Sequence, residues 1–149
     1  MNSSRIAPVL TALADQGWCV QPDFLSADQI AALRVEALSR HDRGVFHRAG
    51  VGAGQAEVVS EIRGDSILWV EPDDPHPALR PYLELTEALR QAVNREFFLG
   101  LNELESHFAL YPEGTFYRKH LDRFRADDRR ALTAIVYLKA DWQVDDGGL

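Results

Sequence analysis

The residues best suited to do chemistry are His120 and Asp122, which stand two positions apart in the stretch YPEGTFYRKHLD (residues 111–122). In a β-strand, positions i and i+2 project to the same side and lie about 6–7 Å apart. An imidazole nitrogen and a carboxylate oxygen placed in this way reach one small cation between them. They would supply two of the three ligands of the 2-His-1-carboxylate arrangement that holds non-haem Fe(II). The same spacing also fits a hydrogen-bonded pair on a polar sheet face, so the surrounding sequence must decide.

The sequence around this pair carries a longer and more specific pattern. Aromatic residues and a glycine precede it, a charged loop follows over residues 125–130, and then come the β-like run ALTAIVYLKADW and the residues DDGG. The order Y-P-x-G-x-F-Y-x-x-H-x-D, then R-x-L-T-x-I-V-Y-L and W…D-G-G, resembles the Fe(II)/2-oxoglutarate dioxygenases of the prolyl-hydroxylase type. The likeness is closest to the hypoxia-factor prolyl hydroxylases and their bacterial relatives, and it is densest over residues 57–149. It implies that His120 and Asp122 bind Fe(II).

One strand-like segment, residues 105–111, leads into the metal-binding stretch. Strand alternation places His107, Ala109 and Tyr111 on one face, and the small Ala109 leaves room between its two larger neighbours. If Tyr111 points into a pocket, His107 does so too. The resemblance implies that Tyr111 contacts 2-oxoglutarate and that His107 lies on the substrate side of the pocket.

A second strand-like segment, residues 131–138, would complete that pocket. Thr133, Ile135 and Tyr137 share one face of it by the same alternation. Hydroxyl groups in a narrow apolar pocket are suited to holding a small dicarboxylate. The resemblance implies that Tyr137 contacts 2-oxoglutarate and that Thr133 and Ile135 line its pocket. The alternative is that these residues, with Tyr111, are core residues of a β-sandwich.

Arg63, Gly64 and Asp65 form a turn-like tripeptide inside residues 57–70, which read as two strands. An I-R-G-D-x-I-x-W segment occupies the same place in the resembled hydroxylases and lies over the substrate entrance. The resemblance therefore implies substrate-binding roles for Arg63 and Asp65, and also for Arg130. A self-stabilising charged turn and a solvated arginine are the plain alternatives.

The family pattern is incomplete in this chain. The resembled enzymes add a second metal-binding histidine downstream, followed by an arginine that pairs with the far carboxylate of 2-oxoglutarate. No histidine follows Asp122 here, and the sequence ends at Gly147-Gly148-Leu149. Two protein ligands would hold Fe(II) weakly, and the cosubstrate would lose a charge-assisted partner. We therefore expect a C-terminally incomplete domain with little activity, although natural loss of these residues is the alternative.

Helices are expected to support the sheet. Apolar spacing predicts helices over residues 6–16 and 77–97. Ser26 and Gln29 form a capping box that would begin a third helix ending near residue 41. A short strand is also expected over residues 18–24.

The order of the predicted elements, helices first and strands later, favours an α+β protein with a β-sandwich core. The resemblance implies a double-stranded β-helix, or jelly roll, with supporting N-terminal helices and with its C-terminal strands missing. Unpaired sheet edges in such a domain invite dimerisation. The length suits a single domain over residues 1–149.

Composition excludes several classes of protein. The formal net charge of −7 argues against a nucleic-acid-binding surface, because phosphate contacts need clustered Lys and Arg. No apolar run approaches the ~20 residues that span a bilayer, so we expect no membrane association. Cys19 is the single cysteine and cannot form an internal disulfide, which favours a reducing compartment. We expect a cytoplasmic protein.

The leading functional prediction is an Fe(II)- and 2-oxoglutarate-dependent oxygenase that hydroxylates a protein or peptide, with proline as the residue that the resemblance indicates. Ascorbate is a candidate accessory reductant on the same grounds. The alternative is a non-catalytic peptide-binding or dimerisation module that retains the dioxygenase fold. Metal-independent partner binding that survives His120→Ala would distinguish a binding module from an oxygenase.

Overall fold

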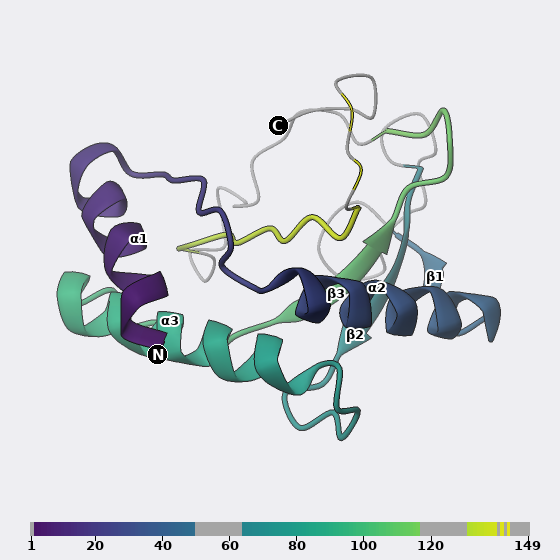
Figure 1. Ribbon diagram of the computed structural model, residues 1–149, viewed down its shortest axis with the longest axis horizontal. Coiled ribbons are helices and arrows are strands. Elements are labelled where there is room, and N and C mark those ends of the chain that lie inside the picture. The colour runs from purple at the N-terminus through teal and green to yellow at the C-terminus, as the bar shows by residue number, and fades with distance from the viewer. Residues whose placement is uncertain (1, 50–63, 117–130, 140, 142, 144–149) are drawn as a thin grey trace. The chain divides into compact units, whose positions relative to one another are not determined.

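The structure is a computed structural model that describes residues 2–49, 64–116, 131–139, 141 and 143 (Figure 1). The chain divides into two compact units, each assembled from segments that are distant in sequence. The helical unit contains Met1–Glu36, Asp74–Leu104 and Ala134–Leu149, and the sheet unit contains Ala37–Asp73 and Glu105–Thr133. A single domain over residues 1–149 stays a prediction.

In the helical unit, α1 (Asn2–Gln16) packs against α3 (Arg80–Phe97). The core residues of α3 recur four positions apart, which places them on one stripe of the helix. Most buried side chains of the two helices are apolar and include Ile6, Val9, Leu85, Leu89 and Val93, and the polar Thr86 of α3 is buried with them. Both helices were predicted from this spacing, and both are confirmed.

The helix α2 (Ala27–Asp42) begins with the predicted capping box. The N–H of Ser26 donates to Gln29 Oε1 at 2.9 Å, and the N–H of Gln29 donates to Ser26 Oγ at 3.3 Å. These bonds satisfy two amides at the helix start that have no partner within the helix. Side-chain chemistry at residues 26 and 29 therefore sets where α2 starts.

The sheet unit contains three strands, β1 (His47–Arg48), β2 (Ser66–Val70) and β3 (Ser106–Leu110). They form an antiparallel sheet in the order β1-β2-β3 (Figure 1). The central strand β2 matches the second half of the strand pair expected over residues 57–70. The first half of that pair lies outside the described residues.

The register of β2 and β3 determines which side chains share a face. Trp69 stands opposite His107, and Leu68 stands opposite Phe108. Ser106 and Phe108, two positions apart, are buried, whereas His107 between them is exposed. The alternation predicted for this segment is therefore present, with one buried and one exposed face.

Two predicted strands are absent from segments that the structure describes. Residues 18–24 form no strand, because Pro22 has no N–H to donate and Asp23 adopts a φ of 56°, in the left-handed region. Residues 131–139 also form no strand, although their sequence is rich in β-branched and aromatic residues. Strand propensity reflects packing and pairing with neighbouring strands, and the described chain pairs no strand with this segment.

Within the described residues, no helix has the combination of length and apolar character needed to cross a membrane.

Candidate active site

A tight turn follows β3 and leads toward the predicted metal ligands. The N–H of Thr115 donates to the carbonyl oxygen of Pro112 at 3.0 Å, and the Thr115 hydroxyl donates to the same oxygen at 2.6 Å. Gly114 lies between them with a φ of 77°, a conformation that favours glycine. His120 and Asp122 follow this turn in sequence but lie outside the described residues, so their role in binding metal stays a prediction.

The turn is fastened to the segment that precedes β2. The N–H of Gly64 donates to the carbonyl oxygen of Phe116 at 3.0 Å. The Cα of Gly64 also faces the side chain of Thr115, and a Cβ built on Gly64 would lie only 2.8 Å from the Thr115 Cβ. The chain entering β2 and the chain leaving β3 are thus held together just before the predicted metal-binding stretch.

The exposed face of the sheet presents an aromatic pair. The rings of Trp69 and His107 meet edge to face, with 5.0 Å between their centroids and an interplanar angle of 63°. Trp69 is 43% exposed, so it is not a core residue. Tyr111, two residues after Ala109, is also exposed. His107 and Ala109 therefore share the exposed face of β3, as strand alternation predicted, and the exposed Tyr111 lies just beyond the end of the strand.

Asp65 behaves differently from an exposed turn residue. Its side chain is only 2% exposed, and its backbone carbonyl accepts a hydrogen bond from the N–H of Ala49 at 3.1 Å. A buried carboxylate requires polar partners, and Asp65 has them. Arg63 and Arg130, the other charged residues predicted to bind substrate, lie outside the described residues. The predicted contacts of all three with substrate stay predictions.

The predicted 2-oxoglutarate pocket is distributed over both units. Tyr111 and Thr133 belong to the sheet unit, whereas Ile135 and Tyr137 belong to the helical unit. All four side chains are exposed. The pocket therefore stays a prediction, and so does the alternative that these residues belong to the core of a β-sandwich. Within the described part of the chain, no group of three or more His, Cys, Asp or Glu residues is placed to hold a metal ion.

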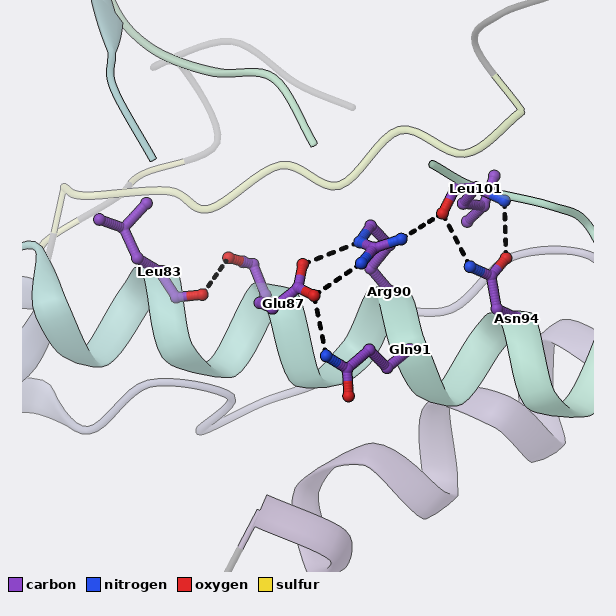
Figure 2. A network of polar contacts seen from close by, with 7 residues as sticks. Leu83, Glu87, Arg90, Gln91, Asn94 and Leu101 are labelled. Atoms are coloured by element: carbon purple, nitrogen blue, oxygen red, sulfur yellow. Dashed lines mark hydrogen bonds and ion pairs between the residues drawn. The ribbon is translucent and has the colours of Figure 1, made fainter. Parts of the chain in front are cut away.

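A network of polar contacts on α3, in the helical unit, was not anticipated from the sequence (Figure 2). Arg90 donates to both carboxylate oxygens of Glu87, at 2.8 Å from Nε and at 2.6 Å from a terminal nitrogen. Gln91 donates to the same carboxylate at 2.9 Å. These hydrogen bonds, the Arg90 bond first, lower the pKa of Glu87 to about 2. The same pairing raises the pKa of Arg90.

This network also holds the chain that follows α3. Arg90 donates to the carbonyl oxygen of Leu101. The Asn94 amide makes two reciprocal bonds with the Leu101 backbone, donating to its carbonyl oxygen and accepting from its N–H, each at 2.7 Å (Figure 2). In the chain between Asn94 and Leu101, Phe98 is the C-cap of α3 and adopts a left-handed φ of 54°. The segment that leads toward β3 therefore has a defined starting conformation.

A second unanticipated contact involves His76. Its Nε2 lies 3.1 Å from the carboxylate of Glu36, which is buried. The N–H of Ala78 donates to His76 Nδ1 at 3.3 Å. The two ring nitrogens of His76 therefore face different partners, Nδ1 the Ala78 N–H and Nε2 the Glu36 carboxylate. This contact fixes the loop before α3 to α2, and only the three-dimensional fold brings its partners together.

Comparison with known proteins places these observations in a family. A model of the 2OG-Fe(II) oxygenase superfamily matches residues 106–149. The crystal structure of a Pseudomonas putida prolyl-4-hydroxylase is 45% identical, with a TM-score of 0.85, and the match covers 96% of this chain and 73% of that one.

Two more distant matches are a curated protein, which is similar in sequence, and a solved structure, which is similar in fold. Egl nine homolog 1 of Rattus norvegicus is 27% identical over 144 residues, which are 94% of this chain and 42% of that protein. The chain thus spans less than half the length of this curated relative. A Trichoplax adhaerens prolyl hydroxylase, solved in complex with a hypoxia-inducible-factor peptide fragment, is 24% identical with a TM-score of 0.55, covering 64% of this chain and 43% of that one. The identity and coverage of the Pseudomonas enzyme establish the relationship: the chain belongs to the 2OG-Fe(II) oxygenase superfamily, among the prolyl hydroxylases.

Proposed function

We propose that this chain carries the Fe(II)- and 2-oxoglutarate-binding part of a protein prolyl hydroxylase. The observation that carries the proposal is the 45% identity with the Pseudomonas prolyl-4-hydroxylase over 96% of the chain, with the His120-x-Asp122 motif inside the matched family region. The family uses Fe(II) and 2-oxoglutarate, as its name states. The three-stranded sheet would be part of a jelly roll.

The donor set fits the metal in type. His120 offers one imidazole nitrogen and Asp122 one carboxylate oxygen, which is the mixed set that non-haem Fe(II) sites use. When bound, Fe(II) supplies the activation of O₂ that lets a C–H bond be hydroxylated. The chain's own contribution is to orient the reactants and to keep coordination positions open.

The exposed hydroxyl groups would orient the cosubstrate. Tyr111 and Tyr137 would donate hydrogen bonds to a carboxylate of 2-oxoglutarate, while Thr133 and Ile135 would line its pocket. A neutral hydroxyl holds a carboxylate less strongly than an arginine does, because only a charged donor gives a charge-assisted bond. The cosubstrate would therefore depend on chelation at the metal for much of its affinity.

A protein substrate is the natural extension of this proposal. The Trichoplax relative was solved with a peptide, and the accessible Trp69–His107 pair offers an apolar, aromatic surface on which a prolyl ring would pack. Arg63, Asp65 and Arg130 remain the charged candidates for binding the peptide chain.

Turnover by the 149-residue chain alone should be slow, since no histidine follows Asp122 to act as a third ligand. The expected reaction is a slow, 2-oxoglutarate-dependent gain of one oxygen atom on a proline-containing peptide, with succinate released. Mass spectrometry of a proline-containing peptide pool, with His120→Ala as the matched variant, tests this. A gain of oxygen that is lost in His120→Ala supports the proposal.

The competing proposal is a non-catalytic module. Peptide binding that persists without metal and survives His120→Ala, with no oxygen gained, would favour it over the oxygenase. A mass that rises with protein concentration would indicate dimerisation through an open sheet edge.

The single cysteine, Cys19, further leads us to propose a reducing, cytoplasmic location, which cell fractionation tests.

A further inference from the structure

Gly64 occupies a position where no other residue fits without displacing its neighbour. A Cβ at residue 64 would lie 2.8 Å from the Cβ of Thr115 and 3.1 Å from its Cγ2. Gly64 does not have the positive φ that several other glycines of this chain have. The requirement for glycine is therefore one of space and not of backbone conformation.

Thr115 has little freedom to move away. The clashing atom is its Cβ, which is attached directly to the backbone, and not the far end of a flexible side chain. That backbone is held by the two hydrogen bonds from Thr115 to the carbonyl oxygen of Pro112. A larger residue at position 64 must displace the whole turn after β3.

The contact joins two functionally different stretches. Gly64 directly follows Arg63, which is predicted to bind substrate, and its N–H bonds to Phe116, four residues before His120. We propose that Gly64 is a positioning residue, which fixes the start of the metal-binding stretch against the start of β2. It does so by packing closely on Thr115 and by donating its N–H to the carbonyl oxygen of Phe116. This inference rests on the proposed function, because it concerns the placement of the predicted metal ligands.

The test is a double-mutant cycle between residues 64 and 115. Gly64→Ala adds the clashing Cβ, and Thr115→Gly removes the atoms that it would meet. Trypsin cleavage after Arg118 and Lys119 in the native protein reports on the stretch that follows Phe116. We expect Gly64→Ala to accelerate this cleavage about five- to tenfold in the native background, as overpacking opens the turn. In the Thr115→Gly background the same change should alter the rate by less than about twofold.

A matched control separates the contact from a general effect of replacing glycine. Gly17 ends α1 with a φ of 79° and with open space around it. Gly17→Ala should lower thermal stability through backbone strain but leave cleavage after Arg118 and Lys119 unchanged. Should Gly64→Ala alone fail to fold, the double variant with Thr115→Gly decides. Recovery of the fold in the double variant supports the close packing of Gly64 on Thr115, and failure to recover the fold overturns it. Equal acceleration by Gly64→Ala in both backgrounds, or none in either, also overturns it.

Metal binding supplies the second readout. In an anaerobic titration with Fe(II) and 2-oxoglutarate, Gly64→Ala should weaken binding about 10- to 100-fold, as loss of groups that orient metal ligands does. In the Thr115→Gly background, which already lacks the hydroxyl bond to Pro112, the same change should alter binding by less than about twofold. Unchanged binding in Gly64→Ala would overturn the positioning role. If the unsubstituted chain binds no metal, the proposed function fails, whereas the cleavage ratio still decides whether Gly64 holds the turn.

Discussion

Trp69 and His107 stand directly opposite each other on β2 and β3, and their rings meet edge to face 5.0 Å apart. Such pairs contribute about 0.5–1.5 kcal/mol beyond the area that they bury. A double-mutant cycle of Trp69→Ala and His107→Ala should give a coupling energy in this range by urea unfolding. Trp69→Phe should retain most of it. Additive effects of the two alanine substitutions would show that the rings meet without stabilising each other.

The pairing of Glu87 with Arg90 predicts a dependence of stability on pH. The pKa of Glu87 is lowered from 4.5 to about 2, so folding stabilises its charged form. The contribution is complete above pH 4.5 and is lost as the pH falls toward 2. The Glu87 side chain is 41% exposed, so solvent screening limits the effect to roughly 0.5–1 kcal/mol.

Unfolding of the unsubstituted chain and of Glu87→Gln at pH 7 and at a pH near 2 measures this contribution. The difference between the two proteins should be present at pH 7 and nearly absent at the lower pH. Glu84→Gln, at an exposed position on the same helix, is the matched control. A difference that stays constant with pH would contradict the assignment to the Glu87 carboxylate.

Asn94 is predicted to be a structural residue at the end of α3. Its side-chain amide both donates to and accepts from the Leu101 backbone. Asn94→Ala removes both bonds and should lower the free energy of unfolding by about 1–3 kcal/mol, since each bond contributes about 0.5–1.5 kcal/mol. Asn94→Asp keeps only the oxygen that accepts from the Leu101 N–H, so its free energy of unfolding should lie between those of the unsubstituted chain and Asn94→Ala. Denaturant unfolding distinguishes them, and equal stability of all three proteins would refute the role.

The sequence predicted those features that arise from local spacing. Repeats four residues apart identified α3, the Ser26–Gln29 capping box located the start of α2, and alternation described β3. The family was recognisable because the H-x-D pair stands in a long ordered pattern with tyrosines, a threonine and glycines at fixed positions. Such signals are contained within short stretches and need no knowledge of the fold.

Features that depend on distant contacts or on single backbone conformations were not predicted. The strand expected over residues 18–24 failed because Asp23 adopts a left-handed conformation after Pro22. The approach of Gly64 to Thr115 and the pairing of His76 with Glu36 bring together residues far apart in the chain. The sequence marked Gly64 only as part of a turn, because the space that a residue lacks is visible only when its neighbour is placed.

The central claim, that this chain binds Fe(II) and 2-oxoglutarate together, is tested most directly by an anaerobic titration that follows the visible charge-transfer absorption of the metal–2-oxoglutarate chelate. A saturable band should form with the unsubstituted chain and disappear in Asp122→Ala, while Asp128→Ala, from the charged loop beyond the motif, should retain it. A band that forms equally well in Asp122→Ala would contradict the assignment of Asp122 as a metal ligand, and no band in the unsubstituted chain would contradict the claim that this chain binds Fe(II) and 2-oxoglutarate together.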